Sequence, residues 1–578
     1  MHRHFYIYIL LTVVSVAGFV QAQDPTPAPT PFVIDKQDVA PENIKGVPAI
    51  APDYRSDART LPDLGRVGVD MTQQRTLTLR EAIELALDNN RDIEVSRQTF
   101  SMAEFDLRSA RGFYQTRLSG QAYYDRSVTP NISVFSTNRN LTNGTLVGNV
   151  ALQAFAPKYG TAFASTFNNQ RLDSDNSISV LSPQYNVGLG FSITQPLFRG
   201  RKTDPTRRTI EIAKRNIELT DTQFQQRSIE TVAGVQKAYW DLTYALRNLQ
   251  VQRDSVRDAK DQLEHNRRLV NDGQLAPIDI VAAETQVANF EQAVYDALNL
   301  VNVAENILKN LVSPNRTSAI WSESLTPVEP VEIAVPNTSL IEAMDLALEN
   351  RPELEINKAQ KDINSIDQQL YREQKKPQID LIASYSTGGI GGDPNRKFNP
   401  SIQTPCVIDP TSPECAQQLA NLRLLTGNPY SGLFANRYPV FRVGINFNLP
   451  LFGDKTAEAQ LGRTQVEAQR LETQREQIEQ GIQVEVRNAL QAVRTAEARL
   501  RSAAIARENN TKQYESEQRK LDAGQSDIYK VLERQTALAA ARSNELRSRT
   551  ELNKAVAELQ RSTGNSLKAN DIVPKLKK

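Results

Sequence analysis

Apolar side chains in the middle of the chain recur with a helical period over a great length. From Asp204 to Val270, a run of about 67 residues contains one proline, at its start, and one glycine, so a single helix would be about 100 Å long. In its second half the apolar positions are spaced alternately by three and four, at Val232, Val235, Tyr239, Leu242, Leu246 and Leu249 and then at Val256, Leu263 and Val270. This period of about 3.5 residues predicts a helix that coils around partner helices.

A second proline-free run, from Lys455 to Leu521, repeats this phase. Its apolar positions are Val486, Leu490, Val493, Leu500, Tyr514 and Leu521. Smaller elements also occur twice: residues 78–90 and 339–351 each begin with Thr or Ser followed three residues later by Glu, which predicts a capping box at a helix start. The sequence therefore predicts two internal structural repeats. Each has the order short helix, helix, strand, long loop, strand, very long helix, turn, helix.

Four shorter segments alternate apolar with small or polar residues, as β-strands do. The clearest are residues 185–193 and 441–449, while residues 118–124 and 379–385 alternate more weakly. An apolar outer face and a wet inner face are typical of a membrane barrel, although a half-buried sheet of a soluble protein has the same pattern. We therefore predict four antiparallel strands per chain. Because four strands cannot close a barrel, the barrel would be shared between chains.

Long polar segments, residues 126–184 and 386–438, separate the paired strands. Within the first, two apolar runs, 150–155 and 161–167, flank Gly160 and would suit an extra hairpin. The second contains the only two cysteines of the chain, which are Cys406 and Cys415. Export to an oxidising compartment favours a local disulfide between them, and two free thiols are the alternative.

The N-terminal part has the features of exported proteins. Residues 1–22 combine an early basic region, an apolar run and a small-residue exit, which predicts a signal peptide. A membrane anchor is the alternative, but the run is shorter than the roughly 20 residues that a spanning helix needs. Residues 23–75 are rich in proline and predict an extended periplasmic leader. The two repeats then occupy residues 76–335 and 336–564, and residues 565–578 form a C-terminal tail.

The composition argues against several classes of function. A formal net charge of +1 over 578 residues gives no reason to expect nucleic acid as a partner. After residue 22 there is no long apolar run, so crossing a membrane would require a β-barrel. Two of the three histidines lie in the predicted signal peptide, and the third, His265, lies on the long helix. The sequence contains no phosphate-binding loop, metal-ligand spacing or nucleophile motif, so we expect neither an enzyme nor a cofactor.

The order of the elements, together with several short motifs, resembles the TolC-type outer-membrane efflux proteins. The resemblance covers roughly Thr76 to Gly564 and rests on the paired Thr/Ser-Leu-x-Glu-Ala-x-x-x-Ala-Leu helices, on residues 195–198 and 238–242, and on Gly273 followed six residues later by Asp279. It implies a mainly α-helical homotrimer in the outer membrane of a Gram-negative-type bacterium. A 12-stranded barrel, with four strands per chain, would continue into a coiled-coil barrel of helices that extends into the periplasm.

The same resemblance implies the function of an exit duct in a tripartite efflux or type I secretion system. Such a duct receives substrates from an inner-membrane efflux pump or ABC-type transporter through a periplasmic adaptor (membrane fusion) protein, and outer-membrane lipid surrounds its barrel. The residues alone leave an alternative, a trimeric coiled-coil surface protein, adhesin or envelope spacer. Such a protein usually runs its heptads once, without two matched strand pairs between them.

The resemblance also places two candidate sites at the inner ends of the long helices. The adaptor-docking turns comprise Asp272, Gly273, Gln274, Gly524 and Gln525. Chain reversal between antiparallel helices is the alternative role of the two glycines. The candidates for the periplasmic aperture are Asp279, Asp527, Lys530 and Glu533. Lys530 stands where the resemblance leads us to expect a carboxylate, and a solvated ion-pair stripe is the alternative role of the last three.

Overall fold

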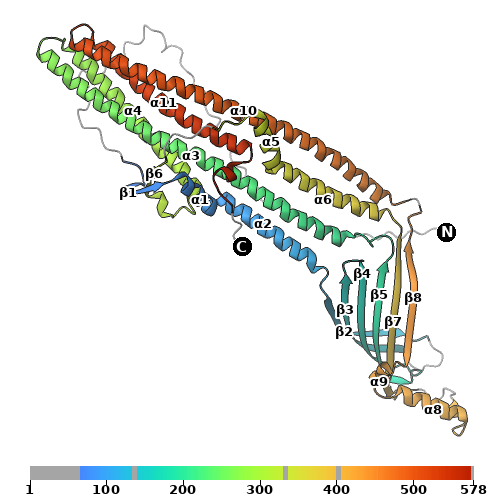
Figure 1. The fold of residues 1–578 in the computed structure, drawn as a ribbon. Coiled ribbons are helices and arrows are strands. Elements are labelled where there is room, and N and C mark those ends of the chain that lie inside the picture. Colours follow the sequence, from blue (N-terminus) through green and yellow to red (C-terminus); the bar gives the residue numbers. More distant parts are fainter. Residues whose placement is uncertain (1–64, 133–138, 330–335, 399–404, 452, 575–578) are drawn as a thin grey trace, which may run out of the picture. The chain divides into compact units, whose positions relative to one another are not determined.

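The computed structural model describes residues 65–132, 139–329, 336–398, 405–451 and 453–574. The predicted signal peptide, the predicted leader up to residue 64 and the last four residues of the predicted tail lie outside these ranges. Within the described part, helices predominate and strands form two separate sheets (Figure 1).

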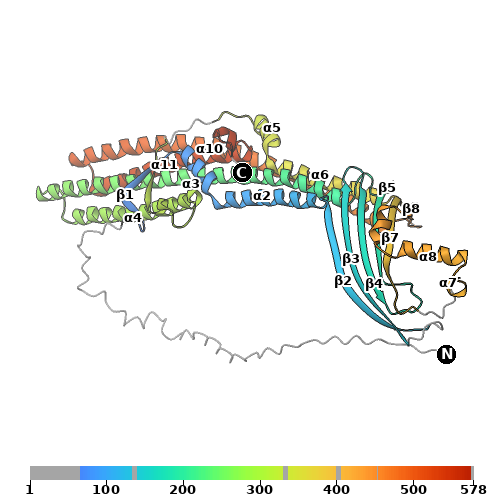
Figure 2. The ribbon, with the colours of Figure 1, turned by 90° about the horizontal axis from the view of Figure 1, so that it is seen from below.

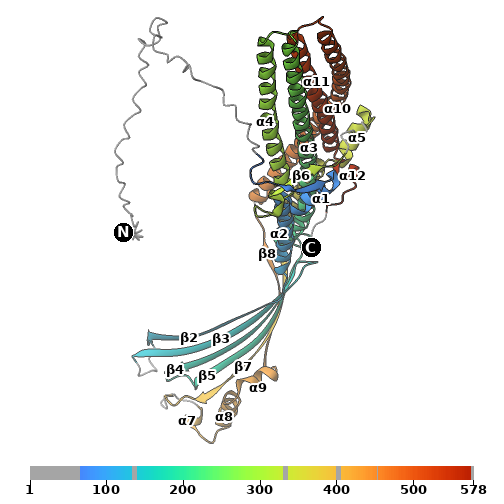
Figure 3. The ribbon, with the colours of Figure 1, turned by 90° about the vertical axis from the view of Figure 1, so that its left-hand side faces the viewer.

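Two pairs of long helices confirm the two predicted rods. They are α3 (Pro205–Asn271) with α4 (Ile278–Val312), and α10 (Lys455–Asp522) with α11 (Ile528–Ser562). Helix α3 starts where the Asp204 side chain accepts hydrogen bonds from the N–H groups of Thr206 and Arg207, and Asp454 caps α10 in the same manner. Each pair packs along its length, and α11 also packs against α3 (Figure 3).

Shorter helices accompany these pairs in a repeated order. Helices α1 (Leu79–Asn89) and α2 (Arg91–Gly112) pack on α3, and α5 (Leu340–Asn350) packs on α10, while α6 (Pro352–Gln374) packs on both α10 and α3. The predicted capping box at Ser339 is complete. A short helix, α12 (Ser566–Ala569), follows α11. In the part of the chain that the structure describes, no helix has both the length and the apolarity to cross a bilayer.

The main sheet has six antiparallel strands in the order β2-β3-β4-β5-β7-β8, so the prediction of four strands per chain is wrong (Figure 2). The strands are β2 (Arg117–Pro130), β3 (Asn140–Ala156), β4 (Thr161–Ser174), β5 (Leu181–Pro196), β7 (Gln378–Pro394) and β8 (Tyr438–Asn448). The additional hairpin, β3–β4, lies in the segment predicted as a long polar loop, and it confirms the extra hairpin suggested by the two apolar runs that flank Gly160. The predicted 12-stranded barrel counted four strands from each of three chains, and three chains with six strands each would contribute 18.

The full length of this hairpin is hard to recognise in the sequence because polar residues interrupt its apolar face. Cross-strand partners lie on the same face of an antiparallel sheet, and the register pairs Gly148 with Asn169 and Leu152 with Ser165. The expected alternation is therefore diluted. The chain reverses at Gly160, whose φ of +70° favours glycine.

The corresponding connection of the second half contains helices instead of strands. Between β7 and β8 lie α7 (Pro405–Ile408), α8 (Pro413–Leu425) and α9 (Pro429–Phe434). Helix α9 packs against β7 and β5. In this connection Cys406 and Cys415 are joined by a disulfide, with their Cα atoms 4.4 Å apart.

A two-stranded parallel sheet, which the sequence did not predict, lies against the helices. It pairs β1 (Asp70–Leu77) with β6 (Glu323–Pro327), which follows a 3-10 turn, η2 (Ala319–Trp321). Strand β1 thus begins inside the segment predicted as leader. The largest apolar cluster joins this sheet to α1, α3 and α4. There the Tyr239 hydroxyl donates to the Leu77 carbonyl at 3.0 Å and ties α3 to β1.

A buried charge cluster fixes α4 against this small sheet. Glu305 Oε2 lies 2.9 Å from Arg66 Nη1 and 3.6 Å from Lys309 Nζ, while Glu305 Oε1 accepts a hydrogen bond from the Leu325 N–H at 2.7 Å. The side chains of Glu305 and Lys309 are fully buried, and Arg66 is 5% exposed. Burial lowers the pKa of Lys309, an effect that the neighbouring Glu305 carboxylate opposes.

Candidate functional site

The first predicted turn is a Schellman motif at the end of α3. The Gly273 N–H donates to the Val270 carbonyl at 3.0 Å, and the Gln274 N–H donates to the Leu269 carbonyl at 2.8 Å. Gly273 has a φ of +74°, and a Cβ added there would meet no atom within 4 Å. The backbone conformation, rather than lack of space, therefore requires glycine at this position. Asp272 closes α3 as its C-cap.

The second turn has the same pattern of hydrogen bonds as the first. The Gly524 N–H donates to the Leu521 carbonyl at 2.9 Å, and the Gln525 N–H donates to the Lys520 carbonyl at 2.7 Å. Gly524 has a φ of +69° and is equally open. Both glycines thus have the chain-reversing role that the sequence left as the alternative. The side chains of Gln274 and Gln525 are exposed, so they are accessible to another protein.

Three of the four predicted aperture residues, Asp279, Asp527 and Lys530, lie at the starts of α4 and α11. Asp279 Oδ2 accepts a hydrogen bond from the Ala276 N–H at 3.1 Å, three residues before it. Asp527 Oδ1 accepts one from the Lys530 N–H at 3.0 Å, three residues after it. The Asp527 contact is the N-cap hydrogen bond of α11, whereas the Asp279 contact ties the first turn of α4 to the residue before its N-cap, Pro277. The lysine at position 530 is therefore accompanied by a carboxylate one helical turn earlier.

Lys530 and Asp527 form an ion pair within the chain. Lys530 Nζ lies 3.1 Å from Asp527 Oδ2, and both side chains are more than half exposed. The backbone hydrogen bond from Lys530, and then its ammonium group, lower the pKa of the Asp527 carboxyl. Glu533 is exposed further along α11. Among the described residues of this single chain, no ion pair joins Asp279 to Lys530.

An apolar cluster holds the two turns together. Leu521, Ile528, Val531 and Leu532 form its buried centre, and Leu275 from the first turn packs against it. A polar contact adds to this, since His265 Nε2 of α3 lies 2.9 Å from Asp522 Oδ1 at the end of α10. Figures 1 and 3 show both turns at the same end of the long helices. At 1.5 Å per residue, α3 places this end about 100 Å from the sheet.

Sequence reasoning missed three exposed apolar side chains at this end. They are Ile278 and Val281 of α4 and Tyr529 of α11, which are 61%, 52% and 58% exposed. Ile278 and Tyr529 occupy equivalent positions, each five residues after its turn glycine. This equal spacing is the signal that could have identified them. Both hairpins thus present exposed apolar side chains just after their turns.

The described chain joins an open six-stranded sheet to two pairs of long helices. The sequence profile of the outer membrane efflux proteins matches residues 82–313 and again residues 343–565. The chain therefore belongs to the outer membrane efflux protein family, as the resemblance predicts. It is a channel protein of the outer membrane that serves efflux.

Solved structures share the fold at low sequence identity. The outer membrane channel CmeC of Campylobacter jejuni has a TM-score of 0.58 and 13% identity, covering 84% of this chain and 86% of CmeC. The outer membrane protein VceC of Vibrio cholerae has a TM-score of 0.56 and 13% identity, covering 84% of this chain and 96% of VceC. The MtrE channel of Neisseria gonorrhoeae in its open state has a TM-score of 0.53 and 15% identity, covering 85% and 89% of the two chains. No curated protein sequence matches the chain.

Proposed function

We propose that three copies of this chain form the exit duct of a tripartite efflux or type I secretion system. The observation that carries this proposal is the open six-stranded sheet. Strands β2 and β8 form its two edges, and no strand of the described chain pairs with their outer sides. Unpaired backbone N–H and C=O groups are incompatible with lipid, so these edges need partners.

The faces of the sheet support a place in the outer membrane. On β8, one face carries Phe441, Val443, Ile445 and Phe447, which are 58–73% exposed. The register continues this apolar face onto β5 through Tyr385 and Phe191. The opposite face carries Asn446, Gly444 and Ser384. Lipid outside and a wet lumen inside match this distribution.

Pairing β2 of one chain with β8 of the next would close three sheets into an 18-stranded barrel. With strands about 4.8 Å apart and tilted by about 40°, such a barrel is about 36 Å wide between backbones, against about 24 Å for 12 strands. The helix pairs would then continue as a coiled-coil barrel into the periplasm. The two matched segments of the family profile support two internal repeats.

The interhelical turns would form the inner end of this duct. We assign docking of a periplasmic adaptor protein to Asp272, Gln274 and Gln525, supported by their exposure beside the turn glycines. We assign the narrow aperture to Asp279, Asp527, Lys530 and Glu533. The adaptor would connect the duct to an inner-membrane efflux pump or ABC-type transporter, which selects the substrate.

Two measurements test the proposal. The mass of the purified detergent complex should correspond to three chains, and the complex should form conducting pores in planar bilayers. A trimer without conductance would favour the alternative of a coiled-coil adhesin. A stable monomer would refute the shared barrel.

A further inference from the structure

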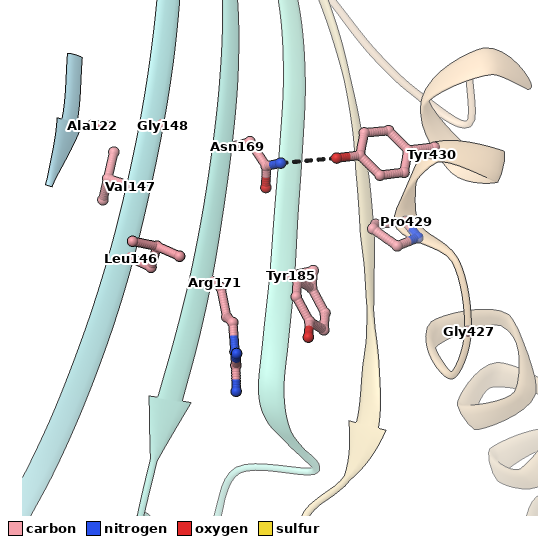
Figure 4. Close-up of a pocket in the computed structure, with 10 residues that line it drawn as sticks. All are labelled: Ala122, Leu146, Val147, Gly148, Asn169, Arg171, Tyr185, Gly427, Pro429 and Tyr430. Atoms are coloured by element: carbon pink, nitrogen blue, oxygen red, sulfur yellow. Dashed lines mark hydrogen bonds between the residues drawn. The ribbon is translucent and has the colours of Figure 1, made fainter. Parts of the chain in front are cut away.

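A groove lies on the apolar face of the sheet, where the β7–β8 connection folds back over it (Figure 4). Its volume is about 440 Å³. The Asn169 side chain of β4 donates a hydrogen bond to the Tyr430 hydroxyl of α9 at 2.8 Å. A Cβ on Gly389 of β7 would lie 1.9 Å from the Pro429 carbonyl oxygen, so glycine is needed for this close approach. The connection is therefore seated on the sheet by specific residues.

The walls of the groove are mainly apolar and open onto the rest of the apolar face. Leu146 and Gly148 of β3, Tyr185 of β5 and Pro429 line it. Towards the helices the same face continues with exposed apolar side chains, which include Val150, Phe163, Phe191 and Ile193. An extended hydrocarbon chain could thus enter from the side and remain in contact with apolar atoms throughout.

Arg171 of β4 is the one charged residue among the described residues that line this groove. Its guanidinium carbon lies 5.9 Å from the centre of the Tyr185 ring. Arg171 Nη2 is 3.2 Å from Asp173 Oδ2, and both side chains are almost half exposed. The cation is accessible, and its present partner is a solvated carboxylate that another anion can replace.

The position of Arg171 along the strand corresponds to the level of lipid headgroups. The apolar face begins near Phe163, eight residues earlier, which is about 26 Å along the strand. With strands tilted by about 40°, this stretch spans about 20 Å of height, which is most of the roughly 25 Å apolar band of outer-membrane barrels. The next residue outward on the same face of β4 is Asp173. Strand β4 starts beside the helices, because Gly160 contacts Gly200 there, so Arg171 lies near the opposite, outer end.

We propose that this groove binds a phosphorylated lipid of the outer leaflet. One acyl chain lies along Leu146 and Gly148, and a phosphate replaces the Asp173 carboxylate on Arg171. The proposal rests on the proposed function, because it requires that this end of the sheet reaches the outer leaflet. The arrangement differs from general lipid contact, since the α9 segment and Arg171 select a chain with an anionic headgroup at one place.

The test measures lipid binding to the purified trimer in detergent by native mass spectrometry. The probe is a bis-phosphorylated, acylated glucosamine disaccharide, and the comparison is the same lipid without phosphates. We expect the intact protein to bind the phosphorylated probe about tenfold more tightly, as a charge-assisted hydrogen bond provides. Arg171→Gln should abolish this preference. Asp173→Asn should increase it several-fold, because the competing carboxylate is gone.

A second pair of variants tests the groove itself. Gly148→Leu places a side chain in the groove, where a Cβ meets only a backbone oxygen at 4.0 Å, and should weaken both probes at least tenfold. The control Gly444→Leu lies on the opposite face of β8, where a Cβ meets nothing within 4 Å, and should bind both probes like the parent.

The outcomes separate this proposal from the proposed function. Unchanged lipid preference in Arg171→Gln and Asp173→Asn, with normal bilayer conductance, would overturn the lipid site and leave the channel standing. If the parent protein is neither trimeric nor conducting, both the lipid site and the proposed function are refuted. Should Gly148→Leu fail to assemble, the opposite effects expected for Arg171→Gln and Asp173→Asn decide the question alone.

Discussion

Replacing Glu305 by alanine tests whether one carboxylate holds the buried charge cluster beside β6 together. The variant would leave Lys309, fully buried, and Arg66, 5% exposed, without their shared counter-ion. Breaking a buried ion pair in this manner costs about 3–5 kcal/mol. The Leu325 N–H also loses its acceptor, which adds about 1 kcal/mol or more. We therefore expect the free energy of unfolding to fall by at least about 4 kcal/mol.

Removing all three charges should do less damage than removing one. The triple variant Arg66→Leu, Glu305→Leu, Lys309→Leu has no unpaired buried charge, so mainly the cost of the orphaned Leu325 N–H remains, about 1–3 kcal/mol. As a control, Glu84→Ala breaks an exposed ion pair with Arg80 and should cost less than about 1 kcal/mol.

Urea unfolding in detergent, followed by tryptophan fluorescence, can measure these differences. The chain has two tryptophans, and Trp321 lies at the cluster, where its carbonyl accepts a hydrogen bond from Lys309 Nζ at 3.0 Å. The reasoning fails if Glu305→Ala is as stable as Glu84→Ala. It also fails if the triple variant loses more stability than the single one, because the charges would then stabilise as a group.

Four further predictions concern the pH dependence, the turns, the aperture and the disulfide. Burial lowers the pKa of Lys309, so burying the charged ammonium group destabilises the fold at neutral pH. The free energy of unfolding should therefore rise as the pH increases from the lowered pKa towards the ordinary value of about 10.4. Lys309→Met should remove this rise in urea titrations. Tryptophan at Gln274 and Gln525 should abolish transport in an efflux assay while trimer and conductance remain; unchanged efflux would argue against docking there. Lys530→Asp should raise the resting conductance and cation preference of the pore, more at low salt than at high salt because exposed pairs are screened; a variant identical to the parent at low salt would show that position 530 does not line the aperture. Intact mass of the exported protein without reductant should show no free thiol, and the bridge, which closes a loop of about ten residues, should contribute roughly 2–3 kcal/mol; two alkylated thiols would contradict it.

The long helices could be predicted because their signal is local and repeated many times. The predicted run from Asp204 to Val270 is α3 from Pro205 to Asn271, and the run from Lys455 to Leu521 is α10 with one further residue. Every apolar residue spaced by three or four marks the same face of the helix, so a single exception such as a charged residue does not change the prediction. Proline and aspartate at the start and glycine after the end then define the boundaries.

The strands could be predicted only where their faces differ clearly. β5 and β8 alternate cleanly, but β3 and β4 carry Gly148, Ser165 and Asn169 on the apolar face, partly because a helix rests there. Strand β1 has a polar, largely exposed sequence and owes its conformation to β6, about 250 residues away, which no local pattern reveals. At the turns, the glycines were predictable from their position directly after each long helix. The exposure of Ile278 and Tyr529, in contrast, depends on packing between two hairpins.

The extra β3–β4 hairpin separates two dimensions of the proposed duct. Strand number determines the width of the barrel, whereas the helices determine the width at the turns, and the hairpin adds strands without adding a long helix. The two parts act as electrical resistances in series. Widening the barrel from about 24 to about 36 Å would lower the resistance of the barrel alone, by about twofold, and the resistance of a narrow aperture at the turns would still dominate the total. In the proposed duct, the hairpin would therefore enlarge the outer mouth without loosening the aperture on the periplasmic side.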